Sequence, residues 1–269
     1  MALPEPSESA TALVTGASAG IGEAIAHELA SRGYGVTLVA RREERLRALA
    51  GELSESHGVR AEAIAADLGD EAARERLAGQ IEALGLEVEI LVNNAGFGTA
   101  ETVFDLDRER LMAMIRLNCE ALLDFQARYL PAMITRGRGA VINIASTAAF
   151  QPIPGTATYA ATKAFVLSLS EAVHEELKGT GVTLTAVCPG PVRTEFAQVA
   201  GIEQAENQLP GVFWMTSEAV AKAAVDAAES GKRAIVPGLI NRATALTGQH
   251  TPRMLALPIA KRLWRRQAL

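Results

Sequence analysis

Near its amino terminus the chain reads TALVTGASAGIG, residues 11–22. The apolar run before Gly16 is typical of a buried strand, and the glycines at 16, 20 and 22 permit a tight turn into a helix that should begin near Glu23. The N-terminus of such a helix offers unpaired N–H groups and the positive end of the helix dipole. The stretch therefore predicts a binding site for an anion such as the pyrophosphate of a dinucleotide.

Short aliphatic runs alternate with helix-sized segments along most of the chain. Seven of these runs have the length and composition of strands: residues 11–15, 35–40, 60–65, 89–93, 140–145, 183–188 and 234–236. Strict alternation predicts a parallel sheet with right-handed crossovers and helices on both faces, the doubly wound α/β architecture.

No linker and no internal repeat interrupts this alternation, so we expect a single main domain. It should span residues 11–240, after a flexible lead-in at 1–10 and before a basic extension at 241–269. Residues 196–216 follow the sixth strand without fitting the alternation. Because ligands bind beyond the carboxyl ends of parallel strands, this segment is predicted to be a substrate lid.

The composition of the 269 residues, 49% hydrophobic and 4% aromatic, fits one aliphatic core. The first ten residues lack the basic and apolar regions of a secretion signal, and a charge-free run at 139–162 is interrupted by polar residues and prolines. Two distant cysteines, Cys119 and Cys188, indicate neither a disulfide framework nor a metal site. We expect a cytoplasmic protein without a nucleic-acid partner.

The end of the second predicted strand bears on the choice of dinucleotide. Ala40 stands where an NAD-specific fold carries an acid for the ribose 2′-hydroxyl, and Arg41 follows it. An arginine without a neighbouring acid suits a 2′-phosphate, and Ser18 could add a hydroxyl contact, so NADP(H) is favoured over NAD(H). The alternative is that Arg41 and Arg42 only begin a solvated helix, paired with the two glutamates that follow.

Tyr159 and Lys163 stand four residues apart in a helix-like stretch and therefore share one face. A tyrosine has an ordinary pKa of about 10, but a nearby ammonium and a cationic nicotinamide both favour its phenolate. Proton exchange with a carbonyl or alcohol oxygen then becomes feasible, and Ser146, just beyond the fifth strand, can hydrogen-bond the same oxygen. Singly, each has a plainer interpretation: the serine as a cap, the Tyr/Lys pair as a solvated surface.

Together, however, these motifs occur in an order that resembles the classical short-chain dehydrogenase/reductase family. The stretches that carry the resemblance are Thr15 to Gly22, Asp67-Leu68, Asn93 to Gly96, Asn118, Ser146, Tyr159-Ala-Ala-Thr-Lys163 and Pro189-Gly190. The resemblance implies a Rossmann-type fold with a seven-stranded parallel sheet and a catalytic tetrad of Asn118, Ser146, Tyr159 and Lys163.

The same resemblance implies individual roles. Asp67 would meet the adenine amino group, and residues 93–96 would line the adenosine ribose and brace the sheet. Asn118 would hold a proton-relay water, while Lys163 would bind the nicotinamide ribose and lower the pKa of Tyr159. The full expected cofactor set is Gly16, Ser18, Gly20, Ile21, Gly22, Arg41, Asp67, Leu68, Asn94, Ala95, Gly96, Tyr159, Lys163, Pro189, Gly190, Val192 and Thr194.

The expected function is hydride transfer between NADP(H) and a carbonyl or secondary alcohol. The candidate walls of the substrate pocket are mostly apolar: Phe97, Thr147, Phe150, Ile153, Phe196, Leu209, Phe213, Trp214 and Met215. They favour a small lipophilic molecule, either a hydrophobic ketone or a 3-oxoacyl compound, although each could instead pack internally. The alternative function is a non-catalytic NADP(H)-sensing protein with the same fold.

The carboxyl-terminal tail is basic. After Glu229 the chain has no acid, but it has Lys232, Arg233, Arg242, Arg253, Lys261, Arg262, Arg265 and Arg266. Apolar residues at helical spacing, Leu255, Ile259 and Leu263, are followed by Trp264. The tail could pack on the body or on a second subunit, contact an anionic membrane, or be disordered. The resemblance also implies a homodimer or homotetramer built through helices expected at 107–135 and 158–178.

Overall fold

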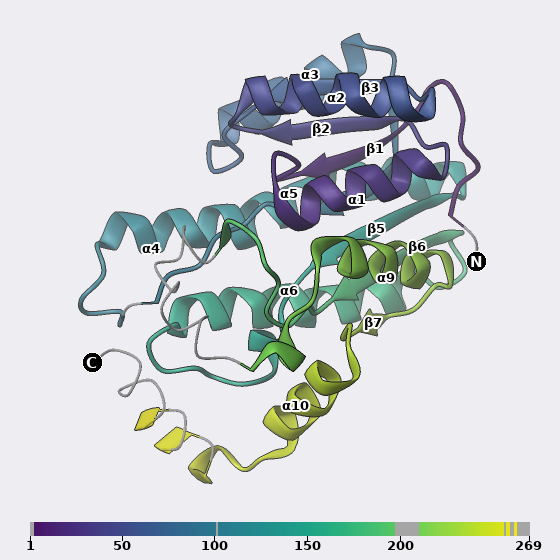
Figure 1. Cartoon of the computed structure of the whole chain (residues 1–269). Helices are drawn as coiled ribbons and strands as arrows, with labels where there is room; N and C mark the ends of the chain where they lie inside the picture. Colours follow the sequence, from purple (N-terminus) through teal and green to yellow (C-terminus); the bar gives the residue numbers. More distant parts are fainter. Residues whose placement is uncertain (1–2, 101, 197–209, 256, 259–260, 263–269) are drawn as a thin grey trace.

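The computed structural model describes residues 3–100, 102–196, 210–255, 257–258 and 261–262. These residues form one seven-stranded parallel sheet in the order β3-β2-β1-β4-β5-β6-β7 (Figure 1). The strands are β1 (Ala10–Thr15), β2 (Val36–Ala40), β3 (Ala61–Ala65), β4 (Glu87–Asn93), β5 (Gly139–Ile144), β6 (Val182–Val187) and β7 (Ala234–Ile235). All seven predicted strands are confirmed, each within two residues of its predicted bounds.

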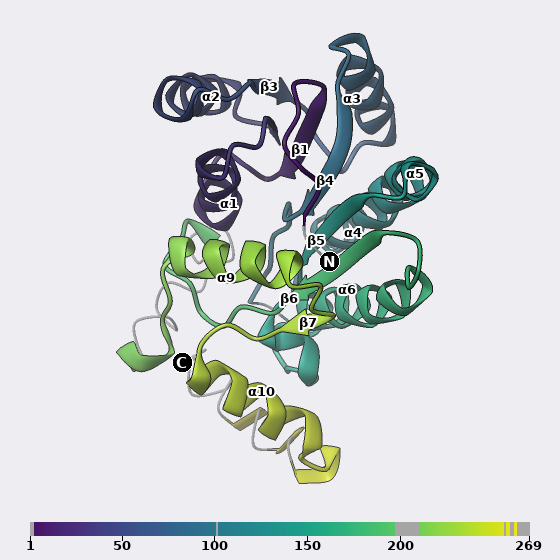
Figure 2. The same cartoon turned by 90° about the vertical axis from the view of Figure 1, so that its right-hand side faces the viewer.

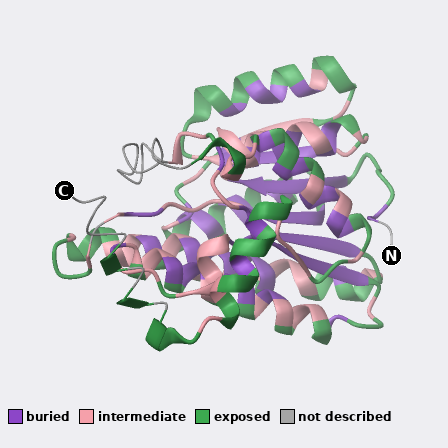
Figure 3. Ribbon diagram, turned by 60° about the horizontal axis from the view of Figure 1, so that its bottom comes forward, coloured by how far each residue is buried: buried purple, intermediate pink, exposed green. Residues whose placement is uncertain are grey.

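Helices cover both faces of the sheet, because successive side chains of a strand point to opposite sides (Figure 2). In β1, Ala12 and Val14 pack toward α1 (Gly20–Ser31), α2 (Glu43–His57) and α9 (Ser217–Glu229). Leu13, between them, packs in a second cluster with residues of α3 (Glu71–Ala83) and α5 (Ala121–Arg136), and α6 (Ala157–Glu176) lies on that face as well. Figure 3 shows the result: the strands are buried and the helices expose their outer sides.

The helix expected at 107–135 is interrupted. It consists of α4 (Arg108–Ile115), a π-helical turn η1 (Arg116–Glu120) and α5. π-helical turns occur frequently at functional sites, and this one contains Asn118.

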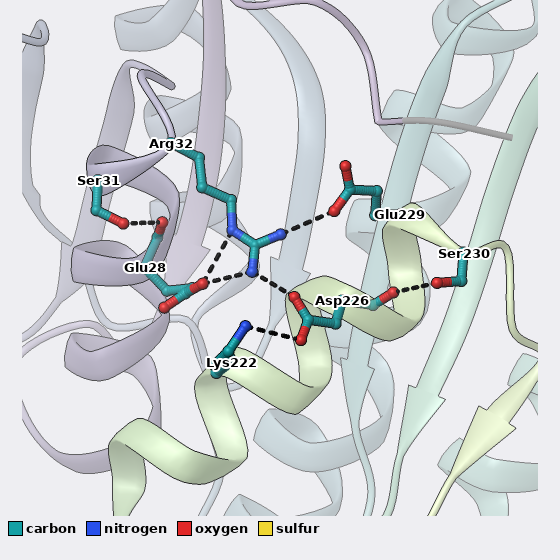
Figure 4. Close-up of polar contacts among 7 residues, drawn as sticks. All are labelled: Glu28, Ser31, Arg32, Lys222, Asp226, Glu229 and Ser230. Carbon is teal, nitrogen blue, oxygen red and sulfur yellow. Dashed lines mark hydrogen bonds and ion pairs between the residues drawn. The ribbon is translucent and has the colours of Figure 1, made fainter.

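An ion-pair cluster joins α1 to α9 on the outside of the sheet (Figure 4). Arg32, which caps the carboxyl end of α1, donates hydrogen bonds to Glu28 of that helix, to Asp226 at 2.5 Å and to Glu229 at 2.9 Å. The apolar sides of the same two helices meet in one core cluster, so the ion pairs lie over a packed contact.

Beyond β7 the chain forms α10 (Leu239–His250), which buries only Asn241 and Ala245. Among the described helices, none combines the length and apolar character needed to cross a lipid bilayer. At the other end, Leu3 is buried in the core cluster that contains α1. The expected domain boundaries stay a prediction, and most of the expected lid (197–209) lies outside the described residues.

Candidate active site

The predicted motifs converge at one edge of the sheet. β1, β4, β5 and β6 run parallel, so their carboxyl ends meet there, and each is followed by one of the motifs: the glycine turn, residues 94–96, Ser146 and Pro189-Gly190. Such an edge is where open α/β sheets bind ligands.

The glycine turn has the geometry of an anion cradle. Gly16 and Gly20 have φ values of +68° and +63°, a left-handed conformation that favours glycine. Helix α1 begins at Gly20, three residues before its predicted start, and Ala19 at its N-cap makes no side-chain hydrogen bond. The N–H groups of the first turn therefore have no side-chain cap, and these residues fit the pyrophosphate of a dinucleotide.

Asn94 braces this turn. Its Nδ2 donates to the carbonyl oxygen of Thr15 at 2.9 Å, and the backbone N–H groups of Asn94 and Ala95 both donate to Thr15 Oγ1, at 2.9 and 3.0 Å. A Cβ built at Gly22 would lie 2.4 Å from Asn94 Nδ2. Asn94 therefore fixes the glycine turn against the end of β4.

Asp67 and Leu68 follow β3 at the same edge of the sheet. The Asp67 side chain is exposed and accepts a hydrogen bond from Gly69 N at 3.0 Å, while Leu68 is buried. Their contacts with an adenine stay a prediction.

Two arginines other than Arg41 make the contacts beside the glycine turn, and the predicted role of Arg41 toward a 2′-phosphate stays a prediction. Arg42, not Arg41, contacts Ser18: its Nε donates to Ser18 Oγ at 3.0 Å and its Nη2 to the Ser18 carbonyl oxygen at 3.1 Å. Arg42 and Arg45 also each form an ion pair with Glu195, at 2.6 and 2.7 Å. Arg41 is exposed and takes no part in these contacts. Arg45 and Glu195 were not predicted to belong to the site, because an ion pair between residues 150 positions apart leaves no local pattern in the sequence.

Lys163 lies beneath Tyr159 in the first turns of α6. Its Nζ donates to the carbonyl oxygen of Ile144, the last residue of β5, at 2.8 Å and lies 5.9 Å from the centre of the Tyr159 ring. The side chain is buried, and desolvation lowers the pKa of Lys163 from 10.5 to about 8. The Ile144 carbonyl thus fixes the position of the Lys163 ammonium, whose charged form is disfavoured by burial.

Ser146 is the N-cap of a short 3-10 helix, η2 (Thr147–Phe150), and accepts a hydrogen bond from Ala148 N at 3.1 Å. Its side chain also lies near enough to the Tyr159 phenol to favour the phenolate. Burial raises the pKa of Tyr159 to about 12, and the influence of Ser146 opposes this rise only in part. Desolvation is the larger of these two influences, and the expected lowering of this pKa by Lys163 and a bound nicotinamide stays a prediction.

Asn118 holds the turn that follows β4. Its Oδ1 accepts from Phe97 N at 3.1 Å, and its Nδ2 donates to the Phe97 carbonyl oxygen at 2.9 Å and to Thr162 Oγ1 at 3.1 Å. Thr162 Oγ1 in turn donates to the carbonyl oxygen of Tyr159 at 2.8 Å. Asn118 thus joins the turn at Phe97 to the helix that carries Tyr159, and the expected relay water stays a prediction.

Buried Arg74 supports the turn that carries Asn118. Its side chain is only 3% exposed and pairs with Glu120, two residues after Asn118, at 2.7 Å and with Asp124 at 2.5 Å. The π-helical turn is therefore anchored from α3.

The expected pocket walls divide into two groups. Phe196 lies beside the phenol, with ring centres 5.5 Å apart, and a Cβ at Gly98 would lie within 3.1 Å of both rings. Gly98, which the sequence analysis missed, therefore leaves room for this contact. By contrast, Phe150 and Met215 pack against core clusters, and Trp214 lies against Arg193. Leu209 lies outside the described residues.

The loop after β6 contacts both the glycine turn and α10 at the carboxyl ends of the strands. A Cβ at Gly20 would lie 2.9 Å from Thr194 Cγ2, which places Thr194 against the glycine turn. A Cβ at Gly190 would lie 2.4 Å from Asn241 Cγ, and Asn241 Nδ2 donates to the Phe213 carbonyl oxygen at 3.2 Å. Asn241, on α10, was not predicted, because its partners are distant in sequence.

Comparison with known proteins agrees with this geometry. A family profile described as short chain dehydrogenase matches residues 10–205. The chain is 37% identical over 201 residues to a very-long-chain 3-oxoacyl-CoA reductase of Anas platyrhynchos, covering 72% of this chain and 64% of that protein, so it spans less than two thirds of that relative. It is 38% identical over 198 residues to sulfoacetaldehyde reductase 2 of Chromohalobacter salexigens, covering 72% and 78% of the two chains. The structure of a short-chain dehydrogenase from Sphingobium yanoikuyae in complex with NADPH is similar, with a TM-score of 0.79, 36% identity, and coverage of 88% and 92%.

Proposed function

The chain belongs to the short-chain dehydrogenase family, and from that premise we propose that it is an NADP(H)-dependent oxidoreductase of carbonyls and secondary alcohols. One observation carries the proposal: Ser146 lies beside the Tyr159 phenol and favours its ionised form, and the Lys163 ammonium lies 5.9 Å from the ring centre. This arrangement can hold a carbonyl oxygen and deliver a proton to it.

The residues have separate tasks in the proposed reaction. The nicotinamide, when bound, supplies or accepts the hydride. Ser146 donates a hydrogen bond to the substrate oxygen, and Tyr159 transfers its hydroxyl proton to that oxygen during reduction. With a pKa of about 12, the phenol is protonated at neutral pH, the form that a reduction requires. Lys163, with a pKa of about 8, is mostly charged there and stabilises the phenolate that proton transfer leaves.

The preference for NADP(H) is supported by the cationic groups beside the glycine turn. Arg42 contacts Ser18, Arg45 shares the partner Glu195 with Arg42, and the end of β2 is Ala40 rather than an acid. The similar Sphingobium structure was solved with NADPH.

A lipophilic carbonyl is the proposed substrate, either a hydrophobic ketone or a 3-oxoacyl compound. Phe196 beside the phenol offers an apolar surface, and one relative is named as a 3-oxoacyl-CoA reductase. The proposed protein assembles into a homodimer or homotetramer. It is located in the cytoplasm, and its basic tail makes peripheral contact with a membrane.

The substrate test compares hydrophobic ketones and 3-oxoacyl thioesters with small polar aldehydes, following nicotinamide absorbance with NADPH and NADH in parallel. Turnover of the lipophilic substrates with NADPH is expected to be the fastest. Faster turnover of the polar aldehydes would contradict the proposed substrate class while leaving the reaction type intact.

The chemical test is Tyr159→Phe, which removes the hydroxyl that transfers the proton. Turnover should fall roughly a thousandfold, while NADPH still binds in a fluorescence titration. Tyr129→Phe is the matched control, because burial raises the pKa of Tyr129 to about 12 as well, yet its hydroxyl has no hydrogen-bond partner among the described residues. Retained turnover in Tyr159→Phe would overturn the proposal.

A further inference from the structure

Glu195 lies between two arginines beside the glycine turn. One carboxylate oxygen accepts from Arg42 Nη1 at 2.6 Å and the other from Arg45 Nη1 at 2.7 Å. These hydrogen bonds hold the pKa of the Glu195 carboxyl below its usual value, so the group is ionised at neutral pH. The Glu195 carboxylate therefore occupies a cationic site formed by the guanidinium groups of Arg42 and Arg45.

The position of this site relates it to the dinucleotide. In an open α/β sheet, the residue at the end of the second strand lies beside the ribose 2′-position. Here that residue is Ala40, and Arg42, two residues later, contacts Ser18 of the glycine turn at 3.0 Å. The site formed by Ser18, Arg42 and Arg45 thus lies where a 2′-phosphate would need cations.

A carboxylate and a phosphate make similar contacts with guanidinium groups, because each presents oxygens that accept paired N–H groups. Glu195 therefore occupies the same donors that a 2′-phosphate would use. A phosphate carries more charge and more acceptor oxygens, so it can displace the carboxylate.

The existing contact is also weak enough to be exchanged. The side chains of Arg42, Arg45 and Glu195 are 42%, 55% and 41% exposed, and ion pairs of such exposure contribute little stability. A surface hollow of about 620 Å³, lined in part by Arg45, Gly20 and Glu195 itself, adjoins the site. A displaced Glu195 side chain has room to enter this hollow.

We infer that Glu195 is a specificity-determining residue that occupies the 2′-phosphate site of the cofactor-free protein and lowers its discrimination for NADP(H) over NAD(H). The inference rests on the proposed NADP(H) preference. It assigns to the residue after Thr194 a role at the adenosine end of the cofactor groove, far along the chain from the second strand.

The test uses the full-length protein and two probes that differ at the 2′-position, adenosine 2′,5′-bisphosphate and adenosine 5′-monophosphate, in isothermal titration calorimetry. Glu195→Gln removes the competing charge and should tighten binding of the bisphosphate about 3- to 10-fold. Binding of the monophosphate should change less than about twofold. Glu44→Gln, on an exposed residue of α2, removes the same charge and should leave the ratio of the two affinities unchanged.

The double variant Arg42→Ala/Glu195→Gln tests whether the effect acts through the arginine. Without Arg42, Glu195→Gln should tighten bisphosphate binding less. Unchanged or weaker bisphosphate binding in Glu195→Gln would overturn the inference, since the carboxylate would then orient the arginines rather than compete. If the wild-type protein turns over NADPH and Glu195→Gln does not tighten bisphosphate binding, the inference is refuted and the proposed function stands. A wild-type protein that binds both probes equally and prefers NADH refutes the proposed cofactor preference, and the inference with it.

Discussion

The two ends of the proposed cofactor site carry positive charge in different ways. At the proposed catalytic end, Lys163 is 6% exposed and held by a backbone carbonyl, and none of the described carboxylates pairs with it. At the adenosine end, Arg42 and Arg45 are about half exposed and paired with Glu195. Burial therefore dominates the electrostatics at the proposed site of proton transfer, whereas ion pairing dominates at the proposed site for a phosphate.

The energies at the two ends differ accordingly. A shift of the Lys163 pKa from 10.5 to about 8 corresponds to a destabilisation of about 3 kcal/mol in the charged form. An exposed ion pair contributes about 0 to 1 kcal/mol. Substitutions at the proposed catalytic end should therefore change stability and turnover more than substitutions at the arginines change cofactor affinity.

The largest effect is expected for Lys163→Met, which removes a buried charge. The free energy of unfolding at pH 7 should rise by about 1 to 3 kcal/mol, while turnover falls by roughly a thousandfold. Because the pKa of Lys163 is lower in the folded chain, the unfolded chain binds more protons between about pH 8 and pH 10.5, and wild-type stability rises across that window. The gain should thus be smaller at pH 10 than at pH 7 in urea unfolding.

Lys232→Met controls for this experiment, because Lys232 is exposed. It should give no gain that depends on pH. An equal stabilisation by Lys163→Met at both pH values would contradict the assignment of its cost to desolvation of the charge.

The next effect is expected at Gly190, where an added Cβ would lie 2.4 Å from Asn241 Cγ. Gly190→Ala should displace the loop after β6 and weaken NADPH binding about tenfold. Asn241→Ala in the same chain should recover part of the affinity, since it removes the colliding atoms. Gly51→Ala, with nothing within 4 Å of its Cβ, is the control. No recovery in the double variant would show that this contact does not position the loop.

The smallest effect is expected at the adenosine end. Arg42→Ala should weaken NADPH binding about 3- to 10-fold and NADH binding less, because only NADPH carries the 2′-phosphate. Arg41→Ala should have the smaller effect of the two, as Arg41 does not contact Ser18. Fluorescence titrations with both cofactors distinguish them, and a larger loss in Arg41→Ala would return the role to the residue first predicted.

The sequence predicts the parts of this molecule that depend on local pattern. The seven strands follow from short aliphatic runs, the glycine turn from its place between a strand and a helix, and the shared face of Tyr159 and Lys163 from their spacing. The remaining features depend on contacts between distant residues. The ion pair between Arg42 and Glu195 joins positions 153 apart, and the raised pKa of Tyr159 reflects burial, which no spacing reveals.

The cluster around Arg32 also has a consequence for synthesis of the chain. Arg32 and Asp226 are 194 positions apart, and α9 covers the apolar side of the helix that begins at the glycine turn. On the ribosome, α1 emerges long before the segment that shields it. The apolar side of α1 therefore stays exposed until α9 has also been synthesised, and this is the stage at which we expect a chaperone to act.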